Sequence, residues 1–151
     1  MTEAPAPDTP PDGGSVANPR PLDLPALAVG HRGAVLRQAD GSAERLAPAA
    51  AVKRLSDGLV PMVCHGPATA RRLNTSPFPA LDLLELFAFV RPATFCRPTA
   101  SGLAEALGLE KPDGIDEEAR ILQLAGGALL TDLIRMEPGR DRDLAAETAR
   151  M

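Results

Sequence analysis

Short apolar runs separated by turn residues open the foldable part of this chain, and they restrict its fold more than any other feature. Residues 26–29 and 33–36 are two such runs, and Asp40-Gly41 supplies a hairpin turn before a third run over residues 44–46. Runs of this length, bounded by glycine, favour β-strands over amphipathic helices, which need longer stretches. The sequence therefore predicts an opening set of antiparallel strands.

Helix and strand signals then alternate. Pro48 suits the first turn of a helix that continues over residues 49–55, because its missing N–H has no partner to lose there. A buried strand is expected over residues 62–65, and a short helix over residues 68–73. The order β-β-β-α-β-α predicts an α/β sheet that begins antiparallel and continues parallel through crossover helices.

Helices are expected in the second half of the chain. Asp82 is suited to cap a helix over residues 83–90, which is apolar on nearly all sides and is therefore expected to be the central buried helix. Thr99 or Ser101 is expected to cap a short helix that Gly108 closes.

A long helix follows, opened by Asp116-Glu117-Glu118, whose charges suit the first turn. Gly126-Gly127 weakens it by about 1 kcal/mol per glycine relative to alanine. We expect Pro138-Gly139 to end it, and residues 139–151 to be the start of a further, truncated helical segment, because no capping residue follows.

The N-terminal segment has a different composition. Residues 1–25 hold seven of the sixteen prolines, so residues 1–24 are expected to be a disordered Pro-rich leader and residues 25–138 a single domain. No signal peptide is visible, and no apolar run approaches the roughly 18–20 residues of a membrane span. We therefore expect a cytoplasmic protein without membrane contact.

Composition also excludes several function classes. A net charge of −4 and only 3% aromatic residues argue against nucleic-acid binding by this chain alone. The two cysteines, Cys64 and Cys96, form no C-x-x-C pair, which excludes a zinc ribbon and a disulfide scaffold. No glycine-rich phosphate loop of either common type is present, so the chain itself is not expected to bind ATP.

Few residues stand out as candidates for chemistry. His65 ends an apolar strand, where α/β sheets present functional groups, and could serve as a general base or metal ligand, but no second histidine or cysteine cluster stands nearby. Cys64 is expected to face the other side of the strand, which disfavours a Cys–His dyad. The first strand contains no acid, so two-metal chemistry lacks its main ligand.

A small basic surface is a further possibility. It would be formed by Arg71, Arg72, Arg91 and Arg97, and it leaves open a modest DNA contact within a larger protein.

Three segments together resemble a known family. They are His-Gly-Pro-Ala-Thr-Ala-Arg-Arg-Leu over residues 65–73, Pro-Phe-Pro-Ala-Leu-Asp-Leu-Leu-Glu-Leu-Phe-Ala-Phe-Val-Arg-Pro over residues 77–92, and Gly-Leu-Ala-Glu-Ala-Leu-Gly-Leu over residues 102–109. They are similar to the N-terminal region of alphaproteobacterial ATP-dependent DNA helicases, which are related to the DinG- and XPD-like helicases. The resemblance covers roughly residues 22–151. It implies an α/β fold of the RNase H-like, DEDD exonuclease-like type, with a mixed sheet, flanking helices and a helical C-terminal part.

The same resemblance implies that the nuclease motifs are degenerate. The Asp-x-Glu pair of the family's first strand is missing. His65 remains from a His-Asn motif, but Gly66 replaces the asparagine, and Ala70 or its neighbour replaces a metal-binding aspartate. Asp82 matches the aspartate that begins the next helix, and Glu118 at most stands in for the final one. No catalytic, cofactor or metal residue is therefore expected, and His65, Asp82 and Glu118 are only remnants.

The resemblance thus implies a non-catalytic, exonuclease-like accessory part of an ATP-dependent DNA helicase. The Walker motifs, ATP and Mg²⁺ would belong to a motor C-terminal to this region. DNA would be reached through the full-length parent, and the domain would pack on the motor. Two alternatives stay open: a stand-alone protein-interaction domain without enzymatic activity, and a residual nuclease.

Overall fold

The computed structural model describes residues 23–148, with side chains as far as Met136. The expected leader, up to residue 22, and residues 149–151 lie outside the described part. The centre of the fold is a five-stranded mixed sheet with the strand order β3-β2-β1-β4-β5. β1 (Ala26–Gly30), β2 (Gly33–Arg37) and β3 (Ala43–Leu46) are antiparallel neighbours, whereas β4 (Met62–Val63) and β5 (Leu81–Asp82) extend the sheet in parallel to β1.

The predicted change from antiparallel to parallel pairing is therefore confirmed. β5 was not predicted, because two residues before a helix leave no periodic pattern in the sequence. β4 is also shorter than the strand expected over residues 62–65.

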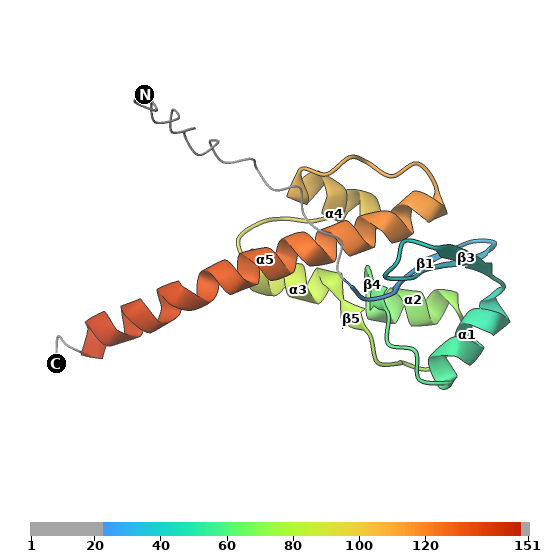
Figure 1. Cartoon of the computed structure of the whole chain (residues 1–151), viewed down its shortest axis with the longest axis horizontal. Helices are drawn as coiled ribbons and strands as arrows, with labels where there is room; N and C mark the ends of the chain where they lie inside the picture. The colour runs from blue at the N-terminus through green and yellow to red at the C-terminus, as the bar shows by residue number, and fades with distance from the viewer. Residues whose placement is uncertain (1–22, 149–151) are drawn as a thin grey trace, which may run out of the picture.

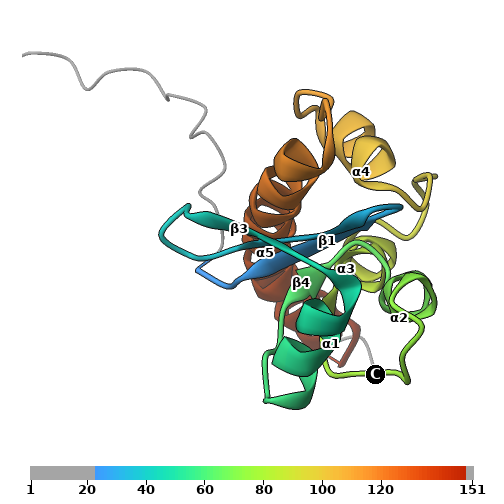
Figure 2. The same ribbon diagram turned by 90° about the vertical axis from the view of Figure 1, so that its right-hand side faces the viewer.

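Five helices flank the sheet within the described residues: α1 (Pro48–Ser56), α2 (Gly66–Arg72), α3 (Leu83–Val90), α4 (Ala100–Leu107) and α5 (Ile115–Thr148). The alternation of side chains along β1 assigns them to two faces. Ala26 and Ala28 pack with α3, α4 and α5, while Leu27 and Val29 pack with α1 and the end of α2. Figures 1 and 2 show the sheet between α1 on one side and α4 and α5 on the other.

α5, rather than α3, is the central helix, which corrects the expectation for residues 83–90. Small residues such as Ala119 and Ala125, both fully buried, let α5 lie close to the alanines of β1. The buried Gln123 fixes it further: its Oε1 accepts from Arg37 Nε at 2.9 Å, and its Nε2 donates to backbone carbonyls including that of Gln38. α3 buries only one face, because Glu85, Ala88 and Phe89 are exposed.

α5 also continues through Pro138-Gly139, where the sequence predicts its end. A proline inside a helix removes one backbone hydrogen bond and crowds the carbonyl four residues earlier. These effects kink or weaken a helix but do not always end it. In Figure 1 the second half of α5 extends away from the rest of the molecule.

The helix caps and the hairpin turn, which depend on a few neighbouring residues, were predicted correctly. Asp82 caps α3, Thr99 caps α4 by accepting from Gly102 N at 2.9 Å, and Gly108 closes α4 in the left-handed conformation. Asp40 and Gly41 form the turn between β2 and β3, as predicted. Among the described residues, no helix has both the length and the apolar character that crossing a bilayer requires.

Candidate functional site

A pocket of about 110 Å³ lies at the carboxyl-terminal ends of β1 and β4. The start of α2, the start of α4 and the first turn of α5 complete its walls. This edge of an α/β sheet is where ligands commonly bind, because loops and helix starts gather there. Its polar lining comes from Cys64, His65, Thr69, Arg72, Thr99 and Glu118.

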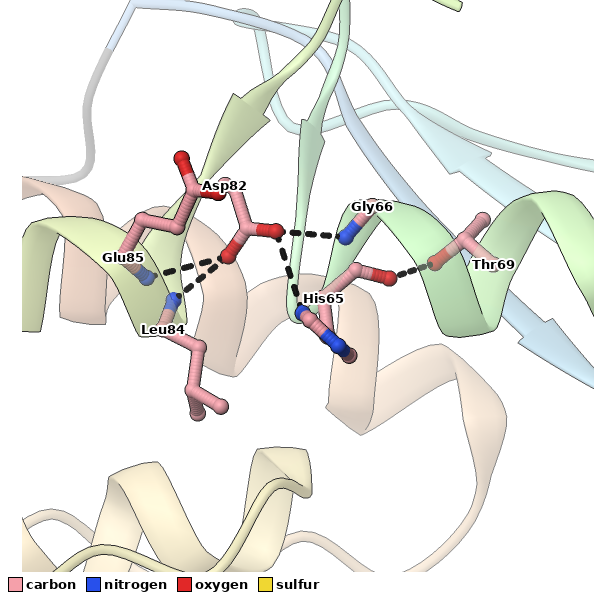
Figure 3. Close-up of polar contacts among 6 residues, drawn as sticks. All are labelled: His65, Gly66, Thr69, Asp82, Leu84 and Glu85. Carbon is pink, nitrogen blue, oxygen red and sulfur yellow. Dashed lines mark hydrogen bonds and ion pairs between the residues drawn. The ribbon is translucent and has the colours of Figure 1, made fainter. Parts of the chain in front are cut away.

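His65 lies between this pocket and Asp82. Its Nδ1 is 3.2 Å from Asp82 Oδ2, and its side chain is about one third exposed. Figure 3 shows the other ring nitrogen directed away from Asp82. Because a carboxylate only accepts, the contact favours the tautomer with the proton on Nδ1 and leaves the second nitrogen as an acceptor. Asp82 therefore holds the His65 ring in an orientation in which its second nitrogen is able to accept a proton.

Asp82 is committed to structural contacts. Its Oδ1 accepts from Leu84 N at 3.0 Å and Glu85 N at 3.1 Å, which caps α3. Its Oδ2 accepts from Gly66 N at 2.6 Å, in the first turn of α2, in addition to the contact with His65 (Figure 3). With both oxygens engaged and its side chain only 9% exposed, Asp82 joins two helix starts rather than presenting a free carboxylate.

Glu118 enters the pocket from α5, opposite β1. The β1 residues in the same lining are Leu27, Ala28 and Val29, so no second carboxylate comes from β1. Over the residues that the structure describes, no three His, Cys, Asp or Glu side chains come together as a metal site. Glu118 thus lacks the companion that a two-metal centre requires.

Cys64 lines the same pocket as His65. β4 ends at Val63, so strict alternation does not extend to these residues. Burial, followed by the nearby charges of Asp82 and Glu118, raises the pKa of the Cys64 thiol from 9.0 to about 12. The thiol is therefore no nucleophile at neutral pH.

Two of the four arginines expected to form a basic surface are paired with acids. Arg91 pairs with Asp132 at 2.8 Å, and Arg97 pairs with Glu105 at 2.6 Å. Arg72 donates to the carbonyl of Val29 at 3.0 Å and lines the pocket, and both Arg71 and Arg72 are exposed.

The sequence singled out His65, Asp82 and Glu118, and the structure brings all three to one place: His65 and Glu118 line the pocket, and Asp82 contacts His65. It did not single out Arg72 or Thr69 as pocket residues. The signal that could have found them is their position on the helix that directly follows His65, because a helix start at this sheet edge faces the same space.

Comparison with known proteins assigns this chain to no family. No protein-family profile matches the chain, no curated protein sequence is significantly similar to it, and no solved structure matches it significantly.

Proposed function

We propose that this chain is the N-terminal accessory part of an ATP-dependent DNA helicase, and that it is an exonuclease-like domain without catalytic activity. One observation carries the proposal. His65, Asp82 and Glu118, which the helicase resemblance marks as motif remnants, come together at the carboxyl edge of the sheet: His65 and Glu118 line one pocket, and Asp82 contacts His65. This convergence of separate elements supports the resemblance.

The sheet is compatible with the RNase H-like, DEDD exonuclease-like fold that we propose. A mixed sheet whose first strand lies centrally, between β2 and β4, lets residues from several elements converge at the end of that strand. Nucleases of the two-metal type depend on such convergence.

The residues at that convergence support the proposed lack of catalysis. Two-metal hydrolysis needs several free carboxylates around metal ions about 3.5–4 Å apart. Here the β1 residues in the lining carry no carboxylate, and both oxygens of Asp82 accept backbone N–H groups. The guanidinium of Arg72 also lines the space, where it disfavours a cation.

In this proposal the parent protein unwinds DNA in the cytoplasm, and ATP and Mg²⁺ bind only to its motor. The accessory domain packs on that motor within the same protein. Its own net charge of −4 does not oppose this role, because the motor would supply the basic DNA channel.

The genomic reading frame after residue 151 provides the most direct test. We expect it to encode a Walker A lysine motif followed by helicase motor motifs. A stop codon immediately after Met151 in intact genomic DNA would contradict the proposal.

The second candidate is a stand-alone protein-interaction domain. It is favoured by the strong exposure of two large apolar side chains, Phe95 at 84% and Ile134 at 67%, because burial of such groups against a partner is favourable. Pull-down experiments with the 151-residue chain distinguish the two, since a stand-alone module captures a separately encoded protein while a motor accessory part does not.

A further inference from the structure

We propose that the end of the β1–β2 hairpin binds a small monocarboxylate with an apolar body. The site lies between the hairpin, β3 and the start of α5, and we call it the hairpin pocket. Its lining consists of residues 30–35, Arg45, Leu46 and Ile115. It shares no lining residue with the pocket around His65, and it does not depend on the proposed helicase role.

The hairpin pocket has the size of a small-molecule site. Its volume is about 390 Å³, compared with about 110 Å³ for the pocket around His65. Sites for small organic ligands span roughly 300–1,000 Å³. The space is therefore large enough for an organic ligand rather than for a few water molecules.

Two glycines that pair across the hairpin, Gly30 and Gly33, keep this space open. A Cβ added to Gly30 would lie 3.1 Å from Cδ1 of Ile115. A Cβ added to Gly33, whose φ is +149°, would lie 2.8 Å from the carbonyl oxygen of Leu46. The hairpin end thus presents backbone at both positions, and a glycine in a strand is typical of places where another group approaches closely.

The walls beside these glycines are apolar. Val35 and Leu46 are buried side chains of β2 and β3. Ile115 packs against the core cluster that contains Val35 and is still partly exposed. An apolar ligand body placed here would remove the remaining surface of Ile115 from water, which is favourable.

Cationic and polar side chains stand at the rim. His31 and Arg32 are exposed in the hairpin turn, and neither pairs with another side chain in the part of the chain that the structure describes. Arg45 contacts Asp116 through Nη2 alone, and its side chain is 75% exposed. A guanidinium can bind a carboxylate through two parallel N–H groups, so Arg32 and Arg45 are suited to hold the charged end of a ligand.

The charge balance at the rim matches one negative charge. Arg32 and Arg45 contribute two positive charges and Asp116 one negative charge, which leaves an excess of one with histidine counted as neutral. Asp113 and Glu117 are outside the lining, and Glu117 accepts from the backbone N–H of Asp113 at 2.6 Å. A carboxylate matches the excess of one, whereas a phosphate monoester carries nearly two negative charges at neutral pH.

Titrations of the 151-residue chain, followed through backbone amide chemical shifts, test the inference with octanoate, acetate and octanol as probes. We expect millimolar octanoate to shift the amides of Gly30, Gly33 and Ile115 in a saturable way. Acetate keeps the charge and octanol keeps the apolar body, so each should bind at least about tenfold more weakly. No saturable shift with octanoate, or equal binding of either control, would overturn the inference.

Matched variants test the guanidinium contact itself. Arg45→Gln combined with Asp116→Asn leaves the charge excess unchanged, and it should weaken octanoate binding at least about tenfold. Asp116→Asn alone should bind octanoate at least as tightly as the wild-type chain, and Lys53→Gln, which removes the cation of another exposed ion pair, should leave binding unchanged. Unchanged binding in the double variant, or a tenfold loss in either single variant, would overturn the inference. Because these side chains are exposed, the variants should fold, and the probe series on the wild-type chain decides in any case.

Two further probes decide the class of the charged group. Octylamine should bind at least about tenfold more weakly than octanoate, and octyl phosphate should bind no more tightly. Tenfold tighter binding of octyl phosphate would overturn the choice of a monocarboxylate, and octylamine binding as tight as that of octanoate would overturn the role of the cationic rim. A reading frame without a motor after residue 151 would overturn the proposed function and leave this inference intact.

Discussion

At the residue scale, one carboxylate connects two helices and a candidate site. Asp82 caps α3 through Oδ1 and accepts from the first turn of α2 through Oδ2. Asp82→Ala removes the cap, worth about 0.5–2 kcal/mol, and a hydrogen bond to a charged group, worth about 1.5–3 kcal/mol. We expect the free energy of unfolding to fall by about 2–4 kcal/mol, measured by urea denaturation. Asp82→Asn keeps one side-chain oxygen as an acceptor, so its free energy of unfolding should fall by about half as much. Asp57→Ala removes only an exposed ion pair, so its free energy of unfolding should change little. A loss for Asp82→Ala no larger than for Asp57→Ala would contradict the structural role.

The Cys64 thiol supplies a second prediction at this scale. With a pKa of about 12 instead of 9.0, its thiolate fraction at pH 8 is about a thousandfold smaller than that of an ordinary thiol. Iodoacetamide should therefore modify Cys64 slowly in the folded chain and rapidly in urea, as mass spectrometry of the cysteine peptides can measure. Because folding raises this pKa, the folded state holds the proton more tightly, and the associated stability is lost as pH rises from about 9 towards 12. The chain has no tyrosine to obscure this range. Rapid modification of Cys64 at pH 8 without unfolding would show that the thiol is not buried as described.

At the scale of single elements, α4 packs so closely against the loop before it that position 102 has no room for a side chain larger than that of glycine. A Cβ added to Gly102 would lie 2.3 Å from the carbonyl oxygen of Arg97 and 2.8 Å from its Cβ. Gly102→Ala should therefore destabilise the domain by about 1–3 kcal/mol through overpacking, even though alanine is more favourable than glycine inside a helix by about 1 kcal/mol. Ser101→Ala, one position earlier in the same helix, serves as the control and should stay within about 0.5 kcal/mol. Thermal or urea unfolding of the two variants measures the difference, and a stabilised Gly102→Ala variant would contradict this packing.

The same scale separates what the sequence could predict from what it could not. The caps at Asp82 and Thr99 and the closing Gly108 were predictable, because each depends on residues within a few positions. β5 and the burial of α3 were not, because they depend on which elements pack together. The continuation of α5 past Pro138 also escaped prediction, since one proline only weakens a helix and the surroundings decide whether it continues.

At the scale of the whole molecule, the order of the strands creates the candidate site. The spacing of residues 65, 82 and 118 in the sequence does not predict that they lie together. Their proximity depends on the pairing of β4 with β1 and on the packing of α5 across β1, which the spacing does not reveal. The family resemblance named the three residues, and only the tertiary structure puts them around one pocket. Arg72 is a residue whose place at the pocket the sequence did not predict: it is exposed, as its type suggests, and it also donates to the carbonyl of Val29 and lines the pocket.

This arrangement leads to a final prediction about metal-dependent chemistry. The chain as a whole should neither degrade single-stranded DNA in Mg²⁺ or Mn²⁺ nor gain thermal stability from either ion, because β1 brings no carboxylate to the pocket that Glu118 lines and Asp82 is engaged by backbone N–H groups. A ligand that binds only the folded state raises Tm, so a shift below about 1 °C at millimolar Mn²⁺ is the expected thermal result. Degradation of a labelled oligonucleotide on a denaturing gel is the activity measurement, with Glu118→Ala and His65→Ala as paired variants. Activity that survives both changes indicates a contaminating nuclease. Activity that Glu118→Ala abolishes, together with a Tm shift that the same variant removes, would establish Glu118 as a metal ligand and contradict the assignment of this domain as non-catalytic.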